Sequence, residues 1–149
     1  VTANIFKMWS RMWSRSRANA VWFVNQDIEP QLLSLDMPVG TGGMPVYLPA
    51  NGISGAPFGT LLGRPIVPIE YCATLGTVGD VILADLSQYV MIEKGGLQAE
   101  TSIHVQFLTD ETAYRFVYRV DGQPAWHDVL TPFKGSSTQS PFVALATRA

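Results

Sequence analysis

The sequence has few charged residues, two histidines and a single cysteine. Charged residues make up 15% of its 149 residues, where about a quarter is usual, and the formal net charge is -2. A soluble monomer depends on surface charge, so this composition predicts that neighbouring molecules cover much of the surface. Apolar residues make up 47% of the chain, which suits one compact domain or two small lobes that share a core.

The scarcity of cysteine and of long apolar runs excludes several classes of protein. Cys72 alone cannot form an internal disulfide, so we expect folding in a compartment that is reducing or indifferent to redox state. No apolar run approaches the ~20 residues that cross a bilayer, and no basic leader with an apolar core opens the chain. We therefore expect a soluble protein without a membrane partner. An amphipathic pattern is already under way at the first residues, so we also expect that the start of the natural protein is missing.

The first predicted element is an amphipathic helix from Ile5 to Trp13. Its apolar residues recur at helical spacing, and Lys7, Arg11 and Arg15 recur at every fourth position on another face. A short apolar run from Ala20 to Val24 follows this helix.

The middle of the chain is predicted to consist of turns and short elements. A brief helix capped by Asp27 is expected to reach Leu35. Between Pro38 and Pro68, seven glycines and six prolines interrupt the apolar pieces, which favours turns and short strands. A strand from Val81 to Ala84 is expected next, followed by one helical turn over Asp85 to Tyr89.

The second half shows the strongest strand signal. Apolar and polar residues alternate from Gln98 to Phe107, which predicts a strand with one buried face, and again from Tyr114 to Val120. Asp121-Gly122 is expected to form a turn, and a loop over 134–140 leads to a last strand over 142–146. The fold class is therefore α+β with antiparallel sheet dominant.

The glycine-rich segments do not match a nucleotide-binding motif. Gly59 and Gly63 are separated by three residues and followed by Arg64-Pro65, whereas a P-loop needs four residues and then Lys and Ser or Thr. A dinucleotide fingerprint that begins with Gly40-Thr41-Gly42-Gly43 would need a glycine at the position of Pro45. Turns are the better interpretation.

The residues that could carry catalysis are few. Cys72 with His104 or His127 is the only possible thiol dyad, with Asp128 as an orienting carboxylate. Cys72 ends an apolar run, however, where a buried and inert thiol is the ordinary finding. Two histidines without a second cysteine also fall short of a closed zinc site. We expect no catalytic, cofactor-binding or metal-binding residue.

Two further polar groups have structural interpretations. Asp110 and Glu111 are interpreted as a turn, because no partner in the sequence marks an acid/base site. The basic stripe, extended by Arg17, could contact nucleic-acid phosphates. A solvated or intersubunit face is the favoured interpretation, because the chain is slightly acidic and lacks a broad basic field.

A set of short sequence phrases is spread over more than 120 positions. The phrases are Val21-Trp22-Phe23-Val24-Asn25-Gln26-Asp27, Gly63-Arg64-Pro65, Glu70-Tyr71-Cys72, Gly79-Asp80, Asp85-Leu86-Ser87-Gln88-Tyr89, His104-Val105, Phe107, Thr109-Asp110-Glu111-Thr112, Arg119-Val120-Asp121-Gly122-Gln123-Pro124 and Ser140-Pro141-Phe142-Val143. Together, and in this order, they resemble the major capsid proteins of tailed phages and prophages with the Hong Kong 97-type fold.

The resemblance implies a subunit with two lobes. A peripheral domain would hold a spine helix and long antiparallel strands, and an axial domain would hold a mixed sheet and short helices. Residues 1–27 would form the end of the spine helix and its strand, residues 28–88 the axial domain, and residues 89–149 mainly peripheral strands with a C-terminal return. The family's N-terminal arm and extended loop precede the spine helix and are expected to be missing here.

The function implied is that of a non-enzymatic shell subunit in the virion. Copies of the chain would assemble in the bacterial host cytoplasm into hexamers and pentamers of an icosahedral head that encloses packaged DNA. Its partners would be other copies, with portal, scaffold or decoration proteins as further candidates and DNA bound only non-specifically. No cofactor or small-molecule substrate is expected. The segment from Pro45 to Arg64 is expected near the capsomer axis.

Two alternatives remain at this point. The chain could be another phage structural or scaffold-associated protein, which need not form closed rings. It could also be a small cytosolic hydrolase that uses Cys72, which would require a deep pocket with convergent polar groups.

Overall fold

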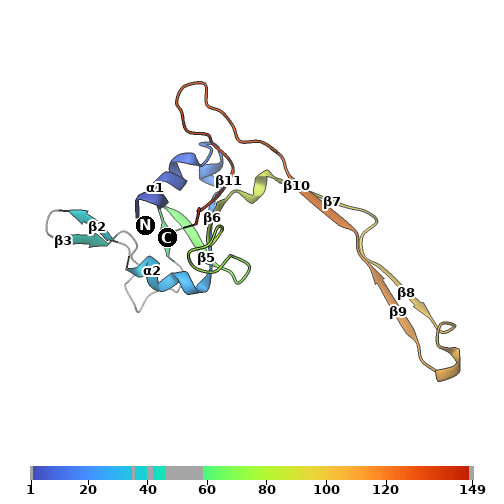
Figure 1. Cartoon of the computed structure of the whole chain (residues 1–149). Coiled ribbons are helices and arrows are strands. Elements are labelled where there is room, and N and C mark those ends of the chain that lie inside the picture. Colours follow the sequence, from blue (N-terminus) through green and yellow to red (C-terminus); the bar gives the residue numbers. More distant parts are fainter. Residues whose placement is uncertain (1, 35, 40–41, 46–58, 148–149) are drawn as a thin grey trace. The chain divides into compact units, whose positions relative to one another are not determined.

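The computed structural model describes residues 2–34, 36–39, 42–45 and 59–147 (Figure 1). The chain divides into two compact units. Unit 1 comprises residues Val1–Ser87 and Trp126–Ala149, and unit 2 comprises the segment between them, residues 88–125. Within the described ranges, no helix has the length and apolar character needed to cross a membrane.

Unit 1 is built on a five-stranded mixed sheet. Its order is β11-β6-β1-β5-β4, in which β1 and β5 run parallel and the other neighbours run antiparallel. The strands are β1 (Val21–Val24), β4 (Thr60–Leu61), β5 (Arg64–Pro68), β6 (Val81–Ala84) and β11 (Phe142–Ala144). The predicted strand over 81–84 is confirmed at both ends, whereas the last strand is shorter than the predicted 142–146.

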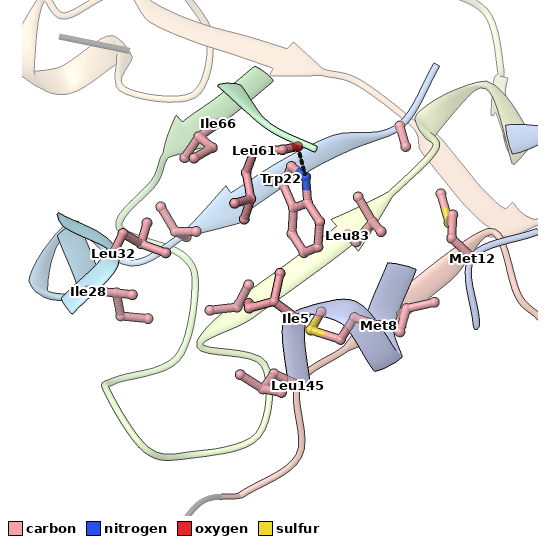
Figure 2. Close-up of a cluster of buried hydrophobic side chains, with 14 residues drawn as sticks. Ile5, Met8, Met12, Trp22, Ile28, Leu32, Leu61, Ile66, Leu83 and Leu145 are labelled. Carbon is pink, nitrogen blue, oxygen red and sulfur yellow. Dashed lines mark hydrogen bonds between the residues drawn. The ribbon is translucent and has the colours of Figure 1, made fainter. Parts of the chain in front are cut away.

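One face of this sheet forms the hydrophobic core. Trp22 in β1 lies opposite Leu83 in β6 and Ile66 in β5, and Leu83 lies opposite Val143 in β11. All four side chains are buried, so a continuous apolar row crosses four of the five strands. Figure 2 shows helix α1 (Thr2–Arg11) and its buried Ile5 against this core, together with the labelled side chains of Ile28, Leu32 and Leu145.

Helix α1 ends two residues earlier than the predicted Trp13. Met12 still donates its backbone N–H to the carbonyl of Met8, but Trp13 donates to the carbonyl of Ser140, and the backbone N–H of Ser140 donates to Arg11. Pairing with the segment that precedes β11 thus replaces the next helical turn. Arg15 therefore lies outside the helix, and the predicted stripe of three cations was wrong at its third member.

The second predicted helix is confirmed with a different cap. It consists of a 3-10 turn (Gln26–Ile28) and α2 (Glu29–Leu33). The side chain of Asn25 accepts a 3.0 Å hydrogen bond from the backbone N–H of Asp27, so Asn25 takes the capping position predicted for Asp27.

The glycine- and proline-rich middle forms two hairpins where it is described. Strands β2 (Asp36–Val39) and β3 (Gly42–Pro45) pair antiparallel, and β4 and β5 are joined by Leu62 and Gly63. Both linking residues have a positive φ, 52° and 73°, which suits the tight turn of a two-residue hairpin loop. The turn prediction at Gly63 is confirmed, while Gly40-Thr41 and residues 46–58 lie outside the described residues.

Unit 2 consists of two antiparallel strand pairs in one ribbon-like segment. Strands β7 (Tyr89–Glu93) and β10 (Val120–Pro124) form one pair, and β8 (Gln98–Ser102) and β9 (Ala113–Val117) form the other. The strand predicted to reach Phe107 ends at Ser102, because the chain turns into a 3-10 helix (Phe107–Thr109). The turn predicted at Asp121-Gly122 was wrong, since both residues lie inside β10.

Candidate functional site: the exposed face of unit 2

The pair β8–β9 separates apolar from polar side chains. Residues directly opposite in an antiparallel pair lie on the same face. Ala99 faces Phe116 and Thr101 faces Tyr114, whereas Glu100 faces Arg115 on the other side of the pair. One face is therefore aromatic and the other carries charge.

The aromatic face is solvent-exposed, contrary to the buried face predicted for this strand. Tyr114 and Phe116 are each 67% exposed, and Leu97 and Ile103 are exposed beside them. No side chain from 88 to 125 is buried. An isolated two-stranded hairpin is marginally stable at best, and exposed apolar patches mark interaction surfaces. The aromatic face thus has the character of a surface that another protein segment covers.

The pair β7–β10 contains a close contact between a tyrosine and a glycine. A Cβ atom added at Gly122 would lie 2.5 Å from Cε1 and 2.9 Å from the hydroxyl oxygen of the Tyr89 side chain. The exposed end of the Tyr89 ring therefore lies over position 122, and a larger residue there would have to displace it.

A hydrogen bond between Tyr118 and Glu93 lies between the two strand pairs of unit 2. It joins the end of β7, at Glu93, to the segment between β9 and β10. The Tyr118 hydroxyl donates to Oε1 of Glu93. This bond raises the pKa of Tyr118, with smaller contributions from burial and from the negative charge of Glu93. The phenol thus stays protonated and keeps its role as donor.

The polar residues at the tip of unit 2 form a turn. Asp110 has a φ of 55° and ends the 3-10 helix, which confirms the turn predicted at Asp110 and Glu111. His104 was predicted within a strand, but β8 ends at Ser102, so His104 lies beyond it. His104 is exposed, and its backbone N–H donates to the Ser102 hydroxyl. Leu108 at this tip is 99% exposed.

The environment of Cys72 opposes nucleophilic activation. The residue is buried and its carbonyl accepts a 2.9 Å hydrogen bond from the Asn25 side chain. Burial raises the pKa of the Cys72 thiol, and the negative charge of Asp80 raises it further. Nucleophilic cysteines need the opposite shift, because the thiolate is the reactive form.

Histidine and acidic residues do not gather into a metal site in the described part of the chain. No group of three or more His, Cys, Asp or Glu side chains there could hold a metal ion. His127 and Asp128 are both exposed, and His104 belongs to the other unit.

Two buried carboxylates were missed by the sequence reasoning. Asp80 and Asp85 flank strand β6, at 0% and 1% exposure. Asp80 accepts from the backbone N–H of Gly76 at 2.9 Å, and Asp85 accepts from the backbone N–H and the hydroxyl of Ser87 at 3.0 and 2.6 Å. The Asp-x-Ser spacing at 85–87 was the available signal. Their partners are turn residues, so both carboxylates stabilise loops.

The basic residues near α1 have different surroundings. Arg15 lies over the ring of Trp13, and Arg17 lies over the ring of Trp9 and donates a 3.0 Å hydrogen bond to its carbonyl. These two arginines therefore stabilise local packing. Lys7 and Arg11 are exposed on the helix.

The structure matches, with a TM-score of 0.63 and 16% identity, a chain of a solved structure described as the capsid of an empty GTA particle computed with C5 symmetry. The match covers 84% of this chain and 41% of that chain, so the chain spans about two-fifths of that protein's length. A comparison with curated protein sequences found no match.

The fold is thus of a kind found in capsid-forming chains. A model of the phage capsid family matches residues 1–134. The chain therefore belongs to the phage capsid family, as the sequence resemblance predicted.

Proposed function

We propose that this chain is a structural subunit of an icosahedral phage or prophage head that encloses packaged DNA. The observation that carries the proposal is the family match over residues 1–134, which includes all of unit 2 and most of unit 1. The protein would act through surface geometry. Complementary surfaces on successive copies close into hexamers and pentamers, and each stable contact buries at least ~1,000 Å².

The finer architecture proposed is the Hong Kong 97-type fold. In this proposal residues 1–27 end the spine helix of the peripheral domain, residues 28–88 form the axial domain, and residues 89–149 return mainly to the peripheral domain. A mixed sheet with short helices in unit 1 and antiparallel pairs in unit 2 are elements that this fold requires, and the sheet joins strands from all three of these segments, namely β1, β4 to β6, and β11. Assembly would take place in the host cytoplasm, with portal, scaffold or decoration proteins as further partners.

We also propose that other protein segments cover the aromatic face of unit 2 in the assembled head. The support is the separation of Tyr114 and Phe116 from Glu100 and Arg115, together with the high exposure of both aromatic rings. Burial of apolar area would supply the free energy of the contact.

Two experiments test this function. DNA-filled particles should be purified from the host that carries the gene, and mass spectrometry should find peptides of this chain as a major component. Recovery of the chain only outside the particles would contradict the proposal. In the second experiment, particle yield should fall for Tyr114→Ser with Phe116→Ser, and it should change less for the matched pair Glu100→Ser with Arg115→Ser on the opposite face.

A further inference from the structure

A basic groove lies between helix α1 and the outer edge of strand β11. It encloses about 440 Å³, and its lining includes Lys7 and Arg11 from the helix and Val143, Ala144 and Leu145 from the strand side. The remaining lining residues are uncharged. Within the described residues Lys7 and Arg11 form no ion pair, so the groove presents two cations and no compensating acid.

The end of helix α1 is joined to the segment that precedes β11, because Trp13 donates its backbone N–H to the Ser140 carbonyl. The backbone N–H of Ser140 also donates to the Arg11 carbonyl. The groove is lined by helix residues between Asn4 and Arg11 on one side and by residues 143–147 on the other. The outer edge of β11 has no neighbouring strand among the described residues.

The exposed residue Ala144 gives β11 a position at which another strand can pair. Strand β11 is the last strand of the sheet order, beside β6 alone. The Asp85 N–H donates to the Pro141 carbonyl, and the Leu145 N–H donates to the Val81 carbonyl. The odd-numbered residues Pro141 and Leu145 thus direct their backbone groups toward β6. Because the direction alternates along an antiparallel strand, the backbone groups of Phe142 and Ala144 point away from β6. The Phe142 N–H donates a 3.1 Å hydrogen bond to the Ser140 hydroxyl, so Ala144 provides the free outward N–H of β11. An unpaired edge of this kind is a template for strand addition.

The spacing of the two cations matches an extended acidic segment. Residues four apart on a helix have Cβ atoms roughly 5–6 Å apart, and every second side chain of a strand is separated by about 6.7 Å. Carboxylates at alternating positions of a strand along β11 would therefore meet Lys7 and Arg11 in turn. Duplex DNA carries one charge per about 1.7 Å, and two cations on a chain of net charge -2 fit two carboxylates better than such a backbone.

We propose that this groove binds an extended acidic segment of another polypeptide chain, which adds to β11 as an outer strand and sets its carboxylates against Lys7 and Arg11. This interaction surface lies within unit 1. It does not depend on the capsid function, because it rests on the groove, the free strand edge and the charge alone.

Fluorescence anisotropy with the 149-residue protein tests the charge requirement. The probe is a fluorescein-labelled eight-residue peptide with alternating glutamate and valine. Lys7→Gln with Arg11→Gln should weaken binding about tenfold, since each exposed pair contributes about two- to fivefold. The control Lys94→Gln with Lys134→Gln removes the same charge elsewhere and should change binding less than about twofold. Unchanged binding by Lys7→Gln with Arg11→Gln, or equal binding of a peptide with glutamine in place of glutamate, would overturn the proposal.

The strand edge is tested with Ala144→Pro. Proline removes the outward N–H and is tolerated on an edge strand, so the variant should keep the thermal unfolding midpoint and lose peptide binding. A fluorescein-labelled DNA duplex serves as the competing ligand. One result would identify a phosphate site and refute the proposal. In that result the peptide does not bind, the duplex does, and duplex binding is abolished by Lys7→Gln with Arg11→Gln but unchanged by Ala144→Pro.

Discussion

The indole nitrogen of Trp22 donates a 2.9 Å hydrogen bond to the carbonyl oxygen of Leu61, 39 residues further along the chain (Figure 2). Strand β5 lies between the strands of these two residues. The indole thus reaches past β5 and ties the edge strand β4 to the middle of the sheet, while its ring fills the core.

Trp22→Phe should lower the free energy of unfolding by about 2–4 kcal/mol. The change leaves the buried Leu61 carbonyl without its donor and removes core volume. Urea denaturation followed by circular dichroism measures the effect. Trp126→Phe is the control, since Trp126 is half-exposed, and its effect should stay below about 1 kcal/mol. Equal effects of the two substitutions would contradict the role of the Trp22 bond.

Ser16→Ala should stabilise the protein. The Ser16 hydroxyl is buried, and it has no hydrogen-bond partner among the described residues. Removal of a buried, unsatisfied hydroxyl should raise the free energy of unfolding by about 1 kcal/mol. Calorimetry should show a higher unfolding midpoint, whereas Ser10→Ala, whose exposed hydroxyl bonds to the Lys7 carbonyl, should give no increase. A lower midpoint for Ser16→Ala would refute this account.

Gly122→Ala should displace the Tyr89 ring and loosen the β7–β10 pair. The added methyl group would lie 2.5 Å from the ring, so the ring must move, and because Tyr89 is 44% exposed we expect a cost of about 1 kcal/mol or less. Hydrogen exchange should speed up at the amides of β7 and β10 and stay unchanged in unit 1. The double variant Tyr89→Ala with Gly122→Ala should recover part of the protection lost in Gly122→Ala. No difference between these two variants would show that the ring contact is unimportant.

The Cys72 thiol should make stability pH-dependent in the alkaline range. Because the folded protein raises the pKa of this thiol, the unfolded chain ionises first, and the free energy of unfolding should fall as pH rises from the ordinary thiol value toward the raised one. Cys72→Ala removes this contribution, so the difference between the two proteins should change with pH in that range. Iodoacetamide should also label folded Cys72 more slowly than the urea-unfolded chain. Labelling as fast in the folded state would indicate an accessible thiolate.

Local sequence patterns predicted the elements that show a regular alternation or a clearly bounded apolar run. The strand from Val81 to Ala84 is confirmed at both ends, and an aspartate bounds this apolar run on each side. The alternation at Tyr114 and Phe116 also places both rings on one face, as expected. These predictions depend on backbone periodicity, which the chain carries locally.

The errors arise where a distant segment or an exposed surface decides the outcome. The helix predicted to Trp13 ends at Arg11 because Ser140, far along the chain, takes over its backbone pairing. The face of Tyr114 and Phe116 was predicted to be buried, since periodicity reveals which residues share a face but not whether anything covers it. The groove beside Lys7 was also missed, because it requires the position of β11.

The base of unit 2 is closed by a 2.8 Å hydrogen bond from the Ala125 amide to the Gln88 carbonyl. The segment therefore departs and returns at adjacent points of the chain path. Equal numbers of residues could be added to or removed from both strands without changing the spacing of these two ends. A shorter or longer unit 2 would therefore leave the five-stranded sheet of unit 1 intact.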